Sequence, residues 1–205
     1  MNDLVIYIHG KGGTSAEADH YAPLFPNCEV IGFDYQAQTP WAATDEFQRF
    51  FDVVSAGRDT VYLIANSIGA FFSLCSLAGK RIRKAFFISP VVDMERLICD
   101  MMQWADVSEE VLRKEKEIPT SFGETLSWEY LSWVRKHPIQ WNIPTEILCG
   151  ADDRLQSPDT IRCFAEKRGI PVTVMENGEH WFHTEEQMRF LDAWLRSAAR
   201  QKPVL

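Results

Sequence analysis

The chain has 205 residues, of which 46% are hydrophobic, and its formal net charge at pH 7 is −8. This hydrophobic fraction excludes a disordered chain, and the length suffices for one domain with a sizeable core. The negative charge argues against a nucleic acid or an anionic membrane surface as a partner. No apolar run approaches the roughly 20 residues of a membrane-spanning helix, and the first residues, MNDLVIYIHG, lack the basic region of a signal peptide.

The cysteines bear on the compartment in which the protein works. They are odd in number and show no C-x-x-C spacing, which indicates buried free thiols in a reducing compartment and therefore a cytoplasmic protein. The five are Cys28, Cys75, Cys99, Cys149 and Cys163. No cluster of His, Cys, Asp and Glu has the spacing of metal ligands, so no metal site is expected.

Strands and helices are predicted to alternate along the chain. Apolar runs predict strands near 4–9, 29–34, 60–66, 84–89, 145–150 and 171–176. Helices are expected near 15–24, 42–56, 68–78, 158–168 and 184–199. Such alternation implies right-handed crossovers and an α/β fold: a three-layer sandwich whose mostly parallel sheet of about six strands has helices on both faces. The last residues, 201–205, are expected to be frayed.

Residues from about 91 to 141 separate two predicted strands by more than a single crossover helix needs. Apolar residues at helical spacing after Met94 and a capping serine at Ser108 predict two helices, and a third is expected over 124–136. Pro119, Ser121 and Gly123 break the chain before the third helix. We expect a single domain, 1–205, with a helical insertion at about 91–141.

Residues 60–70 read TVYLIANSIGA and carry the most informative residue, Ser67. The pattern predicts a buried strand, a sharp turn centred on this serine, and a helix that ends at Gly79. Small residues, Ala65 and Gly69, stand two positions before and after it, where bulky side chains would clash in so tight a turn. The hydroxyl would lie at a helix N-terminus, which favours developing negative charge. An ordinary strand-to-helix junction with a capping serine has the same short pattern.

This turn resembles the nucleophile elbow of the α/β-hydrolase superfamily, G-x-S-x-G, with Ala65 in place of the first glycine. Near the amino terminus, a predicted strand at Leu4–Ile8 leads into the loop HGKGG. In the superfamily an HG pair in this place opens the oxyanion loop, so the resemblance implies that the backbone N–H groups of Lys11 and Ile68 are the oxyanion donors. A phosphate-binding loop is the competing interpretation, but neither G-x-x-x-x-G-K-[ST] nor G-x-G-x-x-G occurs here.

Two further segments follow predicted strands near the carboxyl end. One reads TEILCGADDRLQSP (Thr145–Pro158) and the other VTVMENGEHWFHT (Val172–Thr184). With Ser67 they give the order Ser, Asp, His of the superfamily. Its G-x-x-D and G-x-H patterns imply that Asp153 is the acid and His180 the base.

The residues that flank Asp153 and His180 are interpreted as structural and not as catalytic. Asp152 is expected to stabilise its loop through side-chain hydrogen bonds to the backbone. His183 is interpreted as a surface or packing residue at the start of the last helix. Glu179 and Trp181 flank His180 and could line a pocket, but we interpret them as solvated rim and core.

Together these segments favour a serine hydrolase that cleaves a carboxylic ester or a related acyl compound. Ser67 would attack the carbonyl, His180 would carry the proton and Asp153 would orient His180, through an acyl-enzyme and without a cofactor. In this superfamily an insertion such as 91–141 forms a cap over the active site, and a Met- and Trp-rich cap would provide an adaptable apolar acyl pocket. The expected partner is a small-molecule acyl substrate.

Three other functions stay open at this point. Asn66 and Ser67 resemble the G-N-S-x-G elbows of hydrolases that cleave carbon–carbon bonds. Acyl transfer to an acceptor other than water would use the same residues. A non-catalytic member would bind a ligand without turnover, but such members usually lack a triad residue, and all three positions are filled here.

Overall fold

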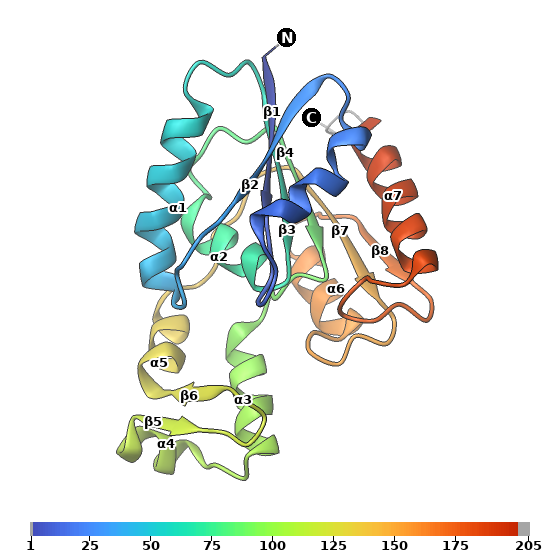
Figure 1. Cartoon of the computed structure of the whole chain (residues 1–205). Coiled ribbons are helices and arrows are strands. Elements are labelled where there is room, and N and C mark those ends of the chain that lie inside the picture. The colour runs from blue at the N-terminus through green and yellow to red at the C-terminus, as the bar shows by residue number, and fades with distance from the viewer. Residues whose placement is uncertain (1, 201–205) are drawn as a thin grey trace. The chain divides into compact units, whose positions relative to one another are not determined.

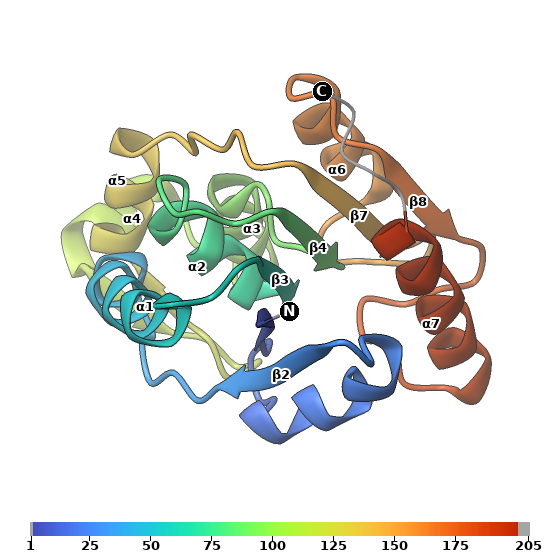
Figure 2. The ribbon, with the colours of Figure 1, turned by 90° about the horizontal axis from the view of Figure 1, so that it is seen from above.

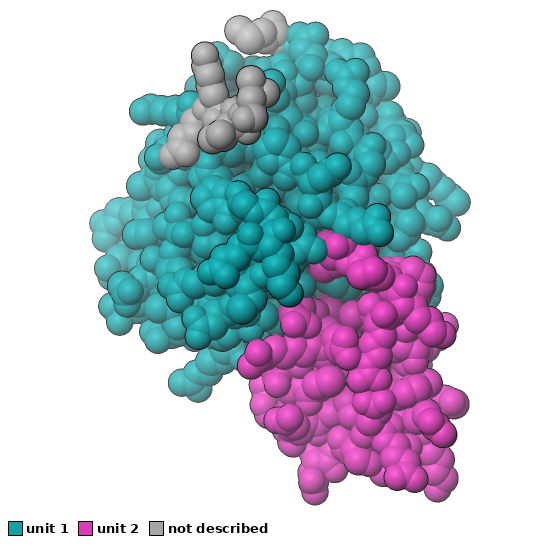
Figure 3. All heavy atoms as spheres, turned by 180° about the vertical axis from the view of Figure 1, so that it is seen from behind, with its two compact units in different colours: residues 1–92, 140–205 teal, residues 93–139 magenta. Residues whose placement is uncertain are grey.

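The structure is a computed structural model that describes residues 2–200. The described residues fall into two compact units, residues 2–92 with 140–200 and residues 93–139 (Figure 3). The expected fraying of residues 201–205 lies outside the described residues.

Within residues 2–92 and 140–200, the larger unit is built on a six-stranded sheet in the order β2-β1-β3-β4-β7-β8, with every pairing parallel (Figure 1). The strands are β1 (Asp3–Ile8), β2 (Cys28–Phe33), β3 (Val61–Asn66), β4 (Lys84–Ile88), β7 (Thr145–Gly150) and β8 (Val172–Met175). The central strands β4 and β7 are buried along their whole length, as expected of parallel strands covered on both faces. The prediction of a mostly parallel α/β fold is confirmed.

Helices cover both faces of this sheet (Figure 2). One face carries α1 (Pro40–Ser55), α2 (Ile68–Ser76) and α6 (Pro158–Glu166), and the other carries α7 (Glu185–Arg200) with two short 3-10 helices, η1 (Ser15–His20) and η2 (Ala22–Leu24). The expectation of a single helix over 15–24 is therefore wrong, because this segment forms two 3-10 helices. Pro23 has no N–H to continue a helical ladder, so η1 ends and η2 begins around it.

The face under α7 holds a continuous apolar core and one buried ion pair. The core joins strand residues to the last helix and the segment before it: Tyr7, Ile64, Phe86, Leu148, Phe182, Leu191, Trp194 and Leu195. Beside it, the Lys84 ammonium on β4 lies 2.5 Å from the Glu146 carboxylate on β7. The same ammonium donates to the carbonyl oxygen of Ala198 at 2.7 Å, which ties the end of α7 to the sheet.

The smaller unit, residues 93–139, contains helices and a short hairpin. Its elements are α3 (Met94–Trp104), α4 (Glu109–Glu115), β5 (Glu117–Pro119), β6 (Thr125–Ser127) and α5 (Trp128–Lys136). The three expected helices are present, but the third begins at Trp128, because the residues before it form β6. Arg135 on α5 joins the helices through its guanidinium, which lies 2.7 Å from the Glu95 carboxylate and 2.8 Å from that of Glu109.

None of the helices within residues 2–200 is long and apolar enough to cross a membrane. The same residues contain no group of three or more His, Cys, Asp or Glu that could hold a metal ion. The cysteines are free thiols, and the expectation that they are buried is right for Cys149 but not for the others. Cys163 is exposed on α6, and three are only partly buried: Cys28, Cys75 and Cys99.

Candidate active site

Ser67 occupies the turn between β3 and α2 in a strained backbone conformation. Its φ is 52° and its ψ is −120°, a region that residues other than glycine rarely adopt. The end of β4 holds it there: the Ser67 N–H donates to the carbonyl oxygen of Ile88 at 3.0 Å, and the N–H of Val91 donates to the Ser67 carbonyl at 3.1 Å. Strain that is fixed in this way is typical of functional sites.

The positions around the serine leave little room for side chains. A Cβ on Gly69 would lie 2.3 Å from the carbonyl oxygen of His9, so glycine is required where α2 passes the end of β1. Ala65, where the superfamily pattern has glycine, is fully buried in β3. A Cβ on Gly10 would lie 3.1 Å from the Ser67 Cβ. The glycine-rich loop after β1 therefore packs directly against the serine turn.

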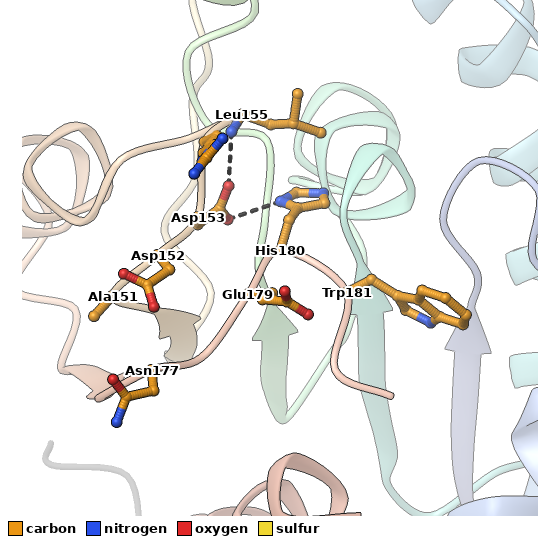
Figure 4. Close-up of a pocket in the computed structure, with 9 residues that line it drawn as sticks. Ala151, Asp152, Asp153, Leu155, Asn177, Glu179, His180 and Trp181 are labelled. Atoms are coloured by element: carbon orange, nitrogen blue, oxygen red, sulfur yellow. Dashed lines mark hydrogen bonds and ion pairs between the residues drawn. The ribbon is translucent and has the colours of Figure 1, made fainter. Parts of the chain in front are cut away.

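Two hydrogen bonds join Ser67, His180 and Asp153. The Ser67 Oγ lies 2.8 Å from the His180 Nε2. The His180 Nδ1 lies 2.7 Å from the Asp153 Oδ2, a bond that Figure 4 shows as a dashed line. The Asp153 side chain is fully buried, and its Oδ1 accepts the N–H groups of Leu155 at 2.9 Å and Gln156 at 3.0 Å. The structure thus brings together the three side chains that the sequence singled out. Hydrogen bonds to both oxygens of the Asp153 carboxylate hold it in place.

The loops that carry the acid and the base are joined through their backbones. The N–H of Asp152 donates to the carbonyl oxygen of Gly178 at 2.8 Å, and that of Ala151 donates to Met175 at 2.9 Å. A Cβ on Gly150 would lie only 2.1 Å from the Gly178 oxygen. The expectation that Asp152 stabilises its loop through its side chain is wrong, because the structure gives that role to its backbone N–H.

A cavity of about 920 Å³ lies beside His180, and the loops after β7 and β8 line it (Figure 4). Its lining residues are Ala151, Asp152, Asp153, Arg154, Leu155, Asn177, Glu179, His180 and Trp181. The interpretation of Trp181 as a core residue is wrong, since the residue is 68% exposed and lines the cavity. The core anchor of this loop is the next residue, Phe182, which is buried.

His183 takes no part in the hydrogen bonds to Ser67. Its ring stacks on Trp181 with centroids 4.5 Å apart, and its Nδ1 lies 2.8 Å from the Trp181 carbonyl oxygen. Its N–H donates to the Gln187 Oε1 at 3.0 Å, at the start of α7. The interpretation of His183 as a surface or packing residue at a helix start agrees with these contacts.

Solved structures share this architecture over nearly the whole chain. Est1E from Butyrivibrio proteoclasticus superposes with a TM-score of 0.74 at 15% identity, over 97% of this chain and 87% of that one. Alpha/beta hydrolase domain-containing protein 10 from mouse gives a TM-score of 0.71 at 14% identity, over 96% and 89%. The chain has the α/β-hydrolase fold.

A third structure with this fold is XC6422 from Xanthomonas campestris, described as a serine hydrolase without a lid. It gives a TM-score of 0.66 at 16% identity, over 99% of this chain and 84% of that one. No family model and no curated protein matches the sequence. At such identities the likeness is one of fold, so the chemistry has to be argued from the residues of this chain.

In the sequence, each predicted oxyanion donor comes directly after one of two residues that pack against each other, Gly10 and Ser67. Lys11 follows Gly10, and Ile68 follows Ser67 as the first residue of α2. The first N–H groups of a helix have no partner within the helix, so they are suited to bind an anion. The assignment of Lys11 and Ile68 as donors stays a prediction, and the packing of Gly10 on the Ser67 turn supports it.

The glycine-rich loop is anchored by residues that sequence reasoning did not single out. The Tyr7 hydroxyl donates to the Glu17 carboxylate, whose other oxygen accepts the N–H of Thr14 at 3.0 Å. Burial raises the pKa of Tyr7 well above its usual value, which keeps the hydroxyl protonated as a donor. Thr14 followed three residues later by Glu17 is a capping-box pattern, and this was the signal available in the sequence.

His9, the histidine of the HG pair, is held from two sides. Its ring stacks on Tyr35 with centroids 4.4 Å apart, and its Nδ1 lies 2.8 Å from the carbonyl oxygen of Gly10. The Tyr35 hydroxyl donates to the His9 carbonyl at 3.0 Å. These contacts make His9 a residue that fixes the course of the loop.

Proposed function

We propose that this protein is a serine hydrolase that cleaves a carboxylic ester or a related acyl compound through an acyl-enzyme intermediate. The observation that carries the proposal is the pair of hydrogen bonds that runs from the Ser67 Oγ through His180 to the buried Asp153, 2.8 Å and 2.7 Å long. A free serine hydroxyl is a weak nucleophile, and an imidazole within reach of its proton is the group that activates it.

The first half of the reaction forms the acyl-enzyme. The Ser67 Oγ attacks the carbonyl carbon while its proton moves to the His180 Nε2, and Asp153 stabilises the imidazolium through the Nδ1–H. The carbonyl oxygen becomes an oxyanion that the N–H groups of Lys11 and Ile68 bind. Losing one such donor costs roughly 3–4 kcal/mol of transition-state stabilisation. His180 then gives its proton to the leaving alcohol as the carbon–oxygen bond breaks.

The second half returns the enzyme to its starting state. A water molecule attacks the acyl carbon and loses a proton to the His180 Nε2. When the intermediate collapses, the acid leaves and the Ser67 oxygen regains its proton from His180. No bound cofactor takes part in this sequence of steps.

The names of the structural neighbours suggest which substrates to try first. Est1E has been solved with ferulic acid bound, and another neighbour is an E-2-(acetamidomethylene)succinate hydrolase. A first panel therefore contains p-nitrophenyl esters of increasing acyl length, matching thioesters and a methyl hydroxycinnamate.

The test combines this panel with a fluorophosphonate probe. We expect the wild-type protein to be labelled and to hydrolyse at least one ester, and Ser67→Ala to lose both properties while it keeps its circular dichroism spectrum. Ser121→Ala, which changes an exposed serine in residues 93–139, is the control and should be labelled like the wild type. Undiminished hydrolysis by Ser67→Ala would refute the proposal.

A further inference from the structure

The loop that carries His180 also presents an indole to the cavity. Trp181 is the next residue, is 68% exposed, and lines the cavity of about 920 Å³. Tryptophan is a large apolar residue that folded proteins bury for the most part. An indole left open beside a site is therefore available to a ligand.

This indole is held in place on one side. The His183 ring stacks on it at an interplanar angle of 19°, and the His183 Nδ1 also lies 3.6 Å from the Glu179 carboxylate. The His183 N–H is bonded to Gln187, which is itself buried and accepts from the backbone at the start of α7. His183 covers one face of the indole, so the opposite face is the one on which a ligand can stack.

The chemistry of the site decides which part of a substrate lies there, and this step rests on the proposed function. The His180 Nε2 has to reach the leaving oxygen in order to protonate it, so the alcohol portion of an ester lies against His180. The carbonyl oxygen lies on the other side, toward Ile68 and the glycine-rich loop. In Figure 4 the indole of Trp181 lies beyond the imidazole, on the side away from Asp153.

The other lining residues narrow the chemistry of this alcohol portion. Leu155, two residues after the acid, is the second large apolar side chain that is exposed at the cavity. Carboxylates from Asp152 and Glu179 line the same cavity, and Arg154 adds one positive charge. The excess of negative charge disfavours an anionic group. The exposed apolar surface of Trp181 and Leu155 suits an uncharged, apolar group.

We infer that Trp181 is a specificity-determining residue that stacks on a neutral aromatic alcohol portion of the ester substrate. The ligand ring would stack on the face of the Trp181 indole opposite His183, so that the indole lies between the two rings. Aromatic pairs gain attraction beyond that of the area they bury, which corresponds to a preference of roughly 2- to 10-fold for a planar ring over a saturated ring of similar size.

The test uses two acetates that differ in the planarity of the alcohol. Benzyl acetate and cyclohexylmethyl acetate share the acyl group, and their alcohols are similar in size and leaving ability. We expect the ratio of kcat/KM for the two to fall roughly 2- to 10-fold in Trp181→Ala and to be largely kept in Trp181→Phe, which retains a ring. Phe190→Ala, which removes an exposed ring from α7, is the control and should keep the wild-type ratio.

A second pair of esters tests the side on which the ring binds. Methyl phenylacetate and methyl cyclohexylacetate carry the planar and the saturated ring in the acyl portion. Their kcat/KM ratio should stay the same in Trp181→Ala. If this ratio falls and that of the acetates does not, the assignment to the alcohol portion is overturned.

The outcomes separate this inference from the proposed function. Ester hydrolysis that depends on Ser67, with an acetate ratio that Trp181→Ala leaves unchanged, would overturn the stacking role and keep the hydrolase. Failure to hydrolyse any of the four esters, together with failure of the fluorophosphonate to label Ser67, would overturn both.

Discussion

Gly150 and Gly178 touch through their backbones, and this contact positions the acid and the base of the candidate site. A Cβ on Gly150 would lie 2.1 Å from the Gly178 carbonyl oxygen, and a Cβ on Gly178 would lie 2.9 Å from the Gly150 Cα. Asp153 and His180 follow these glycines by three and two residues. The distance between the two side chains is therefore set by backbone atoms, which cannot move aside as a flexible side chain could.

Gly150→Ala is expected to destabilise the protein and to slow the reaction, because the new methyl group forces the two loops apart. Overpacking of this kind costs about 1–3 kcal/mol of the free energy of unfolding, to be measured by urea denaturation alongside kcat. Gly79→Ala is the matched control, since a Cβ there meets no atom within 4 Å. Equal stability of the two variants would contradict the argument.

Asp153→Asn should lower kcat by orders of magnitude, as loss of the correct imidazole tautomer does in serine proteases (about 10⁴-fold). Asp152→Asn should lower it far less, because the structure uses the backbone of Asp152 and leaves its carboxylate in the cavity lining. Steady-state kinetics on the best ester decide between them. The reverse order of effects would transfer the role of the acid to Asp152.

Alkaline pH should weaken the fold through its buried tyrosines. Burial is the main cause that raises the pKa of Tyr7, Tyr21 and Tyr35 above the usual value of about 10. Above that pH the unfolded chain releases these protons and the folded chain keeps them, so stability is full below about pH 10 and falls as the pH rises further. Urea denaturation between about pH 8 and 11 should show the fall, and Tyr35→Phe should reduce its slope. An unchanged slope in that variant would contradict this account.

Lys84→Ala should destabilise the protein strongly, because it leaves the Glu146 carboxylate buried without its partner. Breaking a buried pair from one side costs about 3–5 kcal/mol. Lys80 and Asp52 form a pair of similar length in which the aspartate is 64% exposed, so Lys80→Ala should cost at most about 1 kcal/mol. The double variant Lys84→Met with Glu146→Leu should recover most of the loss. If Lys84→Ala and Lys80→Ala unfold at the same urea concentration, burial of the Lys84–Glu146 pair does not raise the cost of losing its lysine.

Much of the larger unit could be predicted because its signals are local. Strands such as β4 and β7 are short apolar runs, and Ser67 lies between one such run and a helix that continues in apolar residues. Asp153 and His180 each follow a strand and a glycine, so their order along the chain was visible as well. A parallel sheet then gathers the ends of its strands at one edge.

The features that sequence reasoning missed depend on contacts between distant residues or on competition between neighbours. The link from Tyr7 to Glu17 requires β1 and η1 to lie side by side, which no local pattern states. Trp181 and Phe182 are adjacent apolar residues, and only the packing of the loop decides that Phe182 enters the core. The hairpin of β5 and β6 has strands of three residues, too short for an alternation of polar and apolar residues to appear.

Ser67 and His180 are separated by 113 positions in the sequence, so the candidate site combines residues from both ends of the chain. Ser67 precedes residues 93–139, whereas Asp153 and His180 follow them, and the sheet joins the two stretches where β4 pairs with β7. A chain severed in the turn between β5 and β6 would yield one fragment with the nucleophile and another with the acid and base. Neither fragment carries all three residues, so turnover by a mixture of the two would show that β4 and β7 have paired again. During synthesis, the growing chain has no activity until the segment that carries His180 has been made.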